Sequence, residues 1–116
     1  MSESDELYST VNYIKHKVDA LEKIEMLNLR SNKALLEEYT EILQNDSTLL
    51  QIYKAIDGTK SQKEIADIIS SSEPSVSRKM QKLLEYGLIE IKEVGAKGKR
   101  VYKHTVAEQA FKLSRL

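Results

Sequence analysis

The sequence has no cysteine, no tryptophan, a single proline and no long uninterrupted apolar run. Without cysteine the chain can form neither a disulfide bond nor a thiolate metal site, which is typical of an intracellular protein. A membrane-spanning helix needs a run of about 18 apolar residues, so none is expected. The N-terminal stretch MSESDELYST is acidic and polar, unlike a signal peptide. We therefore expect a cytoplasmic protein that does not associate with a membrane.

The residues that carry most enzyme chemistry are also scarce. The two histidines, His16 and His104, are not spaced as a pair of metal ligands. The glycines of Gly95-Ala-Lys-Gly98 do not match the spacing of a phosphate-binding loop, and no catalytic triad can be traced. The sequence therefore predicts no metal, no cofactor and no enzymatic activity.

Charge is present in quantity but is unevenly distributed. The 116 residues hold 18 acidic and 18 basic side chains and have no net charge. Residues 1–46 contain ten acidic and five basic side chains, whereas residues 47–116 contain eight acidic and thirteen basic ones. The second part would attract a polyanion such as a nucleic acid, and the first part would repel it. The alternative is a chance separation of solvated charges.

Residues 5–29 have the spacing of a coiled-coil helix. Their apolar positions alternate between intervals of four and three, as on the contact face of a coiled coil. We call this face the apolar seam, and its members are Leu7, Val11, Ile14, Val18 and Leu21. Ser4 is positioned to cap the start of the helix. Because Glu25 and Asn28 interrupt the register, a short pairing of helices is favoured over a long coiled coil.

The pattern resets near Arg30. Two interpretations remain open. Either residues 5–45 form one continuous helix, or a second helix over residues 33–45 begins with Ser31 or Asn32 as its cap.

Three shorter helices are predicted next. The first covers residues 48–57 and has Gly58 where a helix-ending glycine belongs. Ser61-Gln-Lys-Glu64 has the spacing of a capping box and opens the second helix, residues 62–69. The inward-facing residues expected on that second helix are Ile65, Ile68 and Ile69. After a few polar residues, Pro74 starts a third helix, residues 74–86, which Gly87 ends.

The period then changes from helical to extended. Alternating side chains in residues 88–94 predict a strand, and Val101 to His104 predict the strand that returns. The basic turn between them, residues 95–100, contains two glycines. Thr105 and Glu108 repeat the capping-box spacing and predict a last helix, VAEQAFKLSRL, over residues 106–116.

Two helices joined by a tight turn form the helix-turn-helix unit, whose second helix enters the major groove of DNA. Here that second helix has an apolar side, which would hold it on the domain, and a polar, basic side that would face outward. The outward residues expected to contact DNA are Ser75, Ser77, Arg78, Lys79 and Lys82 on the helix, with Lys97, Lys99 and Arg100 on the hairpin turn. Arginine matches the acceptor edge of guanine, and lysine suits phosphate.

The stretch VSRKMQKLLEYGLI resembles the recognition helix of winged helix-turn-helix regulators, in which Gly-Leu-Ile leads into the wing. KEIADIIS is similar to the helix before it, where Ala66 lets two helices approach closely. The resemblance covers about residues 48–105 and is of the MarR and ArsR type, with the subfamily open. It implies a dimeric, sequence-specific DNA-binding transcription regulator. The cysteine clusters of metal-sensing members are missing, and so is the long C-terminal dimerisation helix of others, so we expect dimerisation through the N-terminal helix.

We therefore expect a mainly α protein with one small β-hairpin: an N-terminal helical, dimerising segment over residues 1–46 and a winged helix-turn-helix domain over residues 47–116. The expected partners are double-stranded DNA and a second copy of the chain. The alternative is a winged helix that serves as a protein–protein interaction module in a larger assembly. The sequence leaves open the operator, the regulated genes, the direction of regulation and any small-molecule effector.

Overall fold

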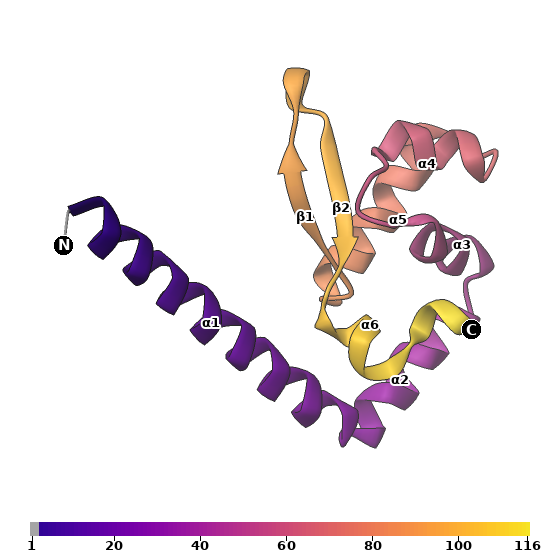
Figure 1. Ribbon diagram of the computed structural model, residues 1–116. Helices are drawn as coiled ribbons and strands as arrows, with labels where there is room; N and C mark the ends of the chain where they lie inside the picture. The colour runs from indigo at the N-terminus through magenta and orange to yellow at the C-terminus, as the bar shows by residue number, and fades with distance from the viewer. Residues whose placement is uncertain (1–2) are drawn as a thin grey trace.

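A computed structural model describes the backbone of residues 3–116 and the side chains of residues 9–116. The described part is mainly helical with one antiparallel hairpin, as the sequence predicted (Figure 1). The helices are α1 (Glu3–Arg30), α2 (Lys33–Gln44), α3 (Ser47–Ala55), α4 (Gln62–Ile68), α5 (Glu73–Glu85) and α6 (Val106–Phe111). The strands are β1 (Ile89–Val94) and β2 (Arg100–His104), and two short 3₁₀ turns are η1 (Ala96–Gly98) and η2 (Leu113–Arg115). No described helix has both the length and the apolar character needed to cross a bilayer.

The N-terminal segment forms two helices and not one. Helix α2 starts at a cap in which the Asn32 side chain accepts a hydrogen bond from the Leu35 N–H at 3.1 Å. Figure 1 shows α1 leaving the rest of the molecule as a separate rod, and only its last turns approach α6. The expected cap Ser4 and the seam residue Leu7 have side chains outside the described residues.

Helices α2 to α5, the base of the hairpin and the C-terminal turns share one core. Its most deeply buried side chains are Leu43, Leu49, Ile52, Tyr53, Ile56, Ile65, Val76, Met80, Leu83, Leu88 and Leu113. Helix α2 contributes to this core through Leu43, while none of the described residues of α1 is buried. The core therefore organises the helix-turn-helix region and leaves α1 outside it.

Two details of α3 and α4 differ from the prediction. Helix α3 ends at Ala55, so Gly58 lies too far along to end it; Gly58 instead belongs to a turn in which the Asp57 carboxylate accepts a hydrogen bond from the Thr59 N–H at 2.9 Å. Ile68 was expected to face inward but is 56% exposed, because α4 ends there and Ala66 takes the buried position with Ile65. The capping box between Ser61 and Glu64 is confirmed.

Helix α5 leads directly into the hairpin. Gly87 has φ +76°, and the N–H groups of Gly87 and Leu88 donate to the carbonyls of Leu84 and Leu83, both at 3.0 Å. This pattern is a Schellman motif, which needs a residue in the left-handed conformation just past the helix. It turns the chain by a fixed geometry, so that Leu88 and Ile89 enter the core at the base of the hairpin.

The last helix is shorter than expected and its predicted capping box is absent. The Thr105 hydroxyl donates to the carbonyl of Gly87 at 2.6 Å instead of capping α6. Glu108 accepts from the hydroxyl of Tyr53 at 2.5 Å and from the N–H of Ser114. Lys112, at φ +53°, ends α6.

Candidate nucleic-acid interface

Helix α5 presents two different sides. Val76, Met80 and Leu83 are buried against the core, and α5 packs on both α3 and α4. Three predicted DNA contacts, Ser77, Arg78 and Lys82, are exposed on the other side. Ser75 is half-buried near the start of the helix, where its N–H donates to the hydroxyl of the cap Ser72. The capped and packed helix therefore holds a short polar and cationic strip in solvent.

Lys79 is placed differently from its neighbours. Its ammonium forms an ion pair with the Asp46 carboxylate, and both side chains are largely covered, with exposures of 25% and 27%. The cation is therefore engaged within the protein rather than free on the outward side. Nothing in the local pattern signals this, because Asp46 lies 33 residues away in the sequence.

The sequence analysis did not select Gln81, although it shares the exposed side of α5. It follows Arg78 by three residues and Ser77 by four, which places all three on one face of a helix. Its amide donates to Glu85 at 3.5 Å. Glutamine can form a bidentate pair with adenine, so the spacing from Arg78 could have identified it.

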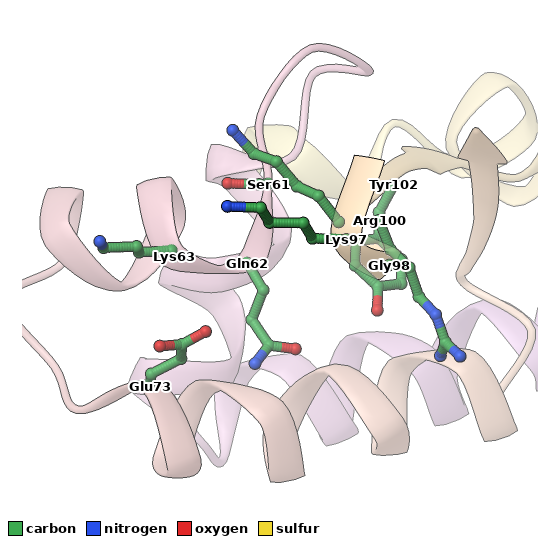
Figure 2. Close-up of a pocket in the computed structure, with 9 residues that line it drawn as sticks. Ser61, Gln62, Lys63, Glu73, Lys97, Gly98, Arg100 and Tyr102 are labelled. Carbon is green, nitrogen blue, oxygen red and sulfur yellow. The ribbon is translucent and has the colours of Figure 1, made fainter. Parts of the chain in front are cut away.

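The wing, residues 95–100, supplies the second group of cations. Lys97, Lys99 and Arg100 are all exposed, and the ammonium of Lys99 lies 3.4 Å from the Glu64 carboxylate. An open pocket of about 510 Å³ separates the wing from the first turns of α4 and α5 (Figure 2). Lys63 on α4 also lines it, a cation that the sequence analysis missed. In Figure 2 the guanidinium of Arg100 points away from the ammonium of Lys97, so the tip offers positive charge in two directions.

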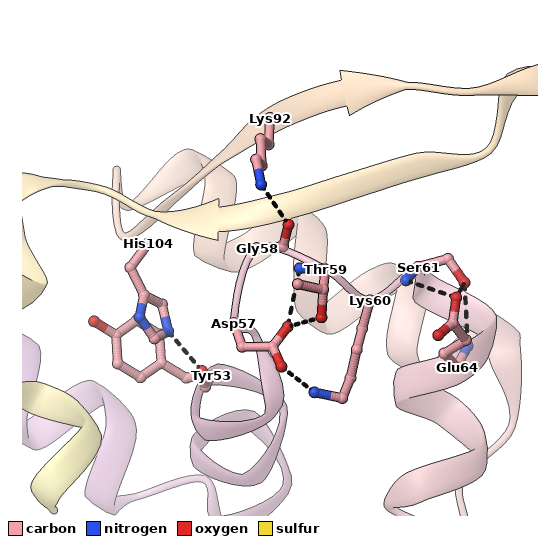
Figure 3. Close-up of polar contacts among 9 residues, drawn as sticks. All are labelled: Tyr53, Asp57, Gly58, Thr59, Lys60, Ser61, Glu64, Lys92 and His104. Atoms are coloured by element: carbon pink, nitrogen blue, oxygen red, sulfur yellow. Dashed lines mark hydrogen bonds and ion pairs between the residues drawn. The ribbon is translucent and has the colours of Figure 1, made fainter.

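Two contacts connect the hairpin to the segment between α3 and α4. The pairing of β1 with β2 shifts between Ile91 and Glu93, as at a β-bulge, and the Lys92 ammonium donates to the Gly58 carbonyl at 2.9 Å (Figure 3). A backbone bridge joins Ser61 to Val101. These contacts hold the wing at a defined position relative to α4.

A polar cluster fixes the base of the hairpin. The His104 ring stacks on the Tyr53 ring with centroids 4.2 Å apart, and its Nε2 is 2.7 Å from the Tyr53 carbonyl (Figure 3). Burial and the hydrogen bond to Glu108 raise the pKa of Tyr53. Burial alone would raise the pKa of Glu108, but hydrogen bonds from Ser114 and Tyr53 outweigh it and lower the pKa. The carboxylate therefore stays ionised and joins α3, α6 and η2.

Helix α1 carries an uncovered apolar face. Four seam side chains are between 46% and 58% exposed, namely Val11, Ile14, Val18 and Leu21. Ile24 and Leu27 continue this exposure toward the body of the molecule. Such a density of exposed aliphatic groups is unusual for a helix that remains alone in water.

Within the described part of the chain, no group of three His, Cys, Asp or Glu side chains is arranged to hold a metal ion.

Residues 42–90 match the family model described as winged helix-turn-helix DNA-binding. The match runs from the end of α2 through α5 to the start of β1, and so includes the α4–turn–α5 unit. Searches among curated proteins and among solved structures found no match to the chain. Residues 42–90 are therefore similar to winged helix-turn-helix DNA-binding domains, and the order of helices and strands around them agrees with that fold.

Proposed function

We propose that the protein is a dimeric transcription regulator that binds double-stranded DNA in a sequence-specific manner and acts in the cytoplasm without catalysis. One observation carries the proposal: the domain that matches the DNA-binding family holds Ser77, Arg78 and Lys82 in solvent on a helix whose opposite side is buried. A helix packed in this way can enter the major groove without exposing the core.

In this arrangement α5 lies in the major groove and the wing rests on the backbone or in the minor groove. Arg78 offers a planar pair of donors to the O6 and N7 acceptors of guanine. Ser75 and Ser77 are short enough to allow close approach and can donate to phosphate or to a base. Lys82 and the wing residues Lys97, Lys99 and Arg100 contribute phosphate contacts. The contacts of the hairpin with the segment between α3 and α4 keep these two groups of cations at fixed positions relative to each other.

The second copy is proposed to pair through α1. The four exposed seam residues lie at coiled-coil spacing, and burying them against another α1 would remove their apolar surface from water. The acidic N-terminal segment would be repelled by DNA, which favours a dimer element that stays away from it. Two domains joined in this way would read two half-sites.

The test is a binding titration with duplex DNA at several salt concentrations. Selection from random duplexes would first identify the preferred sequence, and a palindrome with half-sites about one helical turn apart is expected. Affinity should fall steeply between about 50 and 200 mM salt, since phosphate contacts release counterions. No measurable duplex affinity at low salt would reject the proposal in favour of a protein-interaction module.

Replacing Arg78 distinguishes base reading from phosphate binding. Arg78→Ala should weaken binding to the selected sequence by about 1–3 kcal/mol and binding to random DNA by much less. Arg30→Ala is the matched control, because Arg30 is exposed at the end of α1 and its guanidinium contacts the sulfur of Met26 one turn earlier in the same helix. An equal loss of affinity for both DNAs would mean that Arg78 contacts phosphate and does not read a base.

A further inference from the structure

The ion pair between Asp46 and Lys79 joins the start of α3 to the middle of the recognition helix. One carboxylate oxygen of Asp46 accepts from the Leu49 N–H at 3.1 Å and so caps α3. The other oxygen accepts from the Lys79 ammonium. A single side chain therefore begins one helix and holds a cation of another.

Both partners are well enough covered for this contact to persist. Their side chains are 27% and 25% exposed, so solvent reaches the pair only partly. Burial would raise the pKa of Asp46, but hydrogen bonds from Lys79 and Leu49 and the nearby charge of Lys82 lower it. Asp46 is therefore a carboxylate at neutral pH, placed beside two of the basic residues of α5.

Lys79 directly follows Arg78 and lies one turn before Lys82. Both of these neighbours are exposed on the side of α5 assigned to DNA. A lysine side chain has four rotatable methylene groups, so an unpaired Lys79 could swing its ammonium toward the phosphates beside that side. The ion pair is what directs it elsewhere.

We propose that Asp46 withholds Lys79 from DNA and thereby limits how strongly the domain binds the phosphate backbone. This inference rests on the proposed function, since it assigns a role to a residue next to the DNA-reading surface. It makes Asp46 a positioning residue that sets affinity through Lys79 and touches no base itself. Because a phosphate contact is independent of sequence, its main effect falls on non-specific binding.

Asp46→Asn is the informative variant. Asparagine caps helices as well as aspartate does, so α3 keeps its start while the acceptor for Lys79 loses its charge. The wild-type protein, D46N, K79Q and D46N/K79Q are titrated with random-sequence duplex at several salt concentrations. Thermal unfolding of each variant confirms the fold, and Asp46→Ser provides a second uncharged cap.

The expected result is that Lys79 matters only when Asp46 is removed. In the D46N background, K79Q should reduce the slope of log affinity against log salt by about 0.9 for each bound protomer, the value of one lost phosphate contact. Between about 50 and 200 mM salt this equals about a 3.5-fold change in relative affinity. In the wild-type background the K79Q slope should change much less.

Two outcomes would overturn the inference. An equal slope change in both backgrounds would mean that Lys79 already contacts phosphate in the wild-type protein. No change in either background would mean that a released Lys79 does not reach DNA. If the wild-type protein itself binds no duplex, the proposed function fails first, and the same titration reveals this.

Discussion

The sharpest structural prediction concerns the apolar seam of α1. Substituting Val18 by glutamate places a carboxylate in the middle of the seam, where Val18 is 46% exposed in the single chain. If the seam pairs in parallel and in register with a second α1, the substituted side chain would face the same group in the other copy. Glutamate is a good helix former, so α1 itself should persist.

The magnitude follows from the exposed area. Full burial of a valine, leucine or isoleucine side chain is worth roughly 1.5–3 kcal/mol, so the uncovered half of each seam residue offers about 1 kcal/mol. Burial of four such residues in each of two copies would contribute about 8 kcal/mol of favourable free energy to dimerisation. This is similar in size to the free-energy cost of association, which is about 4–15 kcal/mol. A dimer built on this face is therefore sensitive to small losses. Val18→Glu removes about 1 kcal/mol of burial per copy, which weakens association by at least about 30-fold.

Sedimentation velocity over a concentration series measures this change. Ala20→Glu is the matched control, since Ala20 is exposed two residues further along and about 160° around the helix from Val18. The control adds the same charge to the same helix and should leave the dimer intact. An unchanged dimerisation constant for Val18→Glu, or an equal loss for Ala20→Glu, would refute pairing through the seam.

Two further predictions concern stability. Gly87→Ala forces a residue with a side chain into the left-handed conformation at φ +76°. It should lower the free energy of unfolding by about 1–2 kcal/mol and the melting temperature by several degrees. Gly95→Ala, at φ −88°, is the control and should leave the melting temperature nearly unchanged, so equal melting of the two variants would contradict this explanation. Since the fold lowers the pKa of Glu108, its ionised form contributes stability above the unfolded pKa of about 4.3, and this stability is lost as pH falls through the folded value. Glu108→Gln should flatten that acid loss in denaturant unfolding measured from about pH 6 to pH 3, and an unaltered pH dependence would exclude the cluster as its source.

The features that the sequence predicted correctly depend on residues close together in the chain. The capping box of Ser61 and Glu64 is complete within one turn, and Gly87 ends α5 because the left-handed position follows directly from the helix. The choice of Asn32 over Ser31 also involves only its own turn, although the sequence left both open. Hydrogen bonds between residues close in the chain determine these helix ends, so the sequence pattern alone indicates them.

The capping box that it predicted wrongly, at the start of α6, is replaced by contacts with distant partners. Thr105 and Glu108 have the same spacing as Ser61 and Glu64, yet Thr105 donates to Gly87, 18 residues away, and Glu108 accepts from Tyr53, 55 residues away. A partly buried carboxylate with two or three donors gains more than a surface cap does, so the tertiary contacts prevail. The spacing of two residues cannot reveal which donors the fold will bring to them.

Contacts with distant residues also determine which cations of α5 remain available to DNA. Arg78 and Lys79 are adjacent and share a charge sign, and the sequence pattern treats them alike. In the fold Arg78 is exposed, while Lys79 is paired with a carboxylate that α3 needs for its own cap. A cation that an internal anion holds contributes less to DNA binding, because breaking a covered ion pair offsets part of the gain from a phosphate. Under the proposed role of Asp46, the DNA-binding strength of this domain would depend on where α3 begins as well as on the number of basic residues on α5.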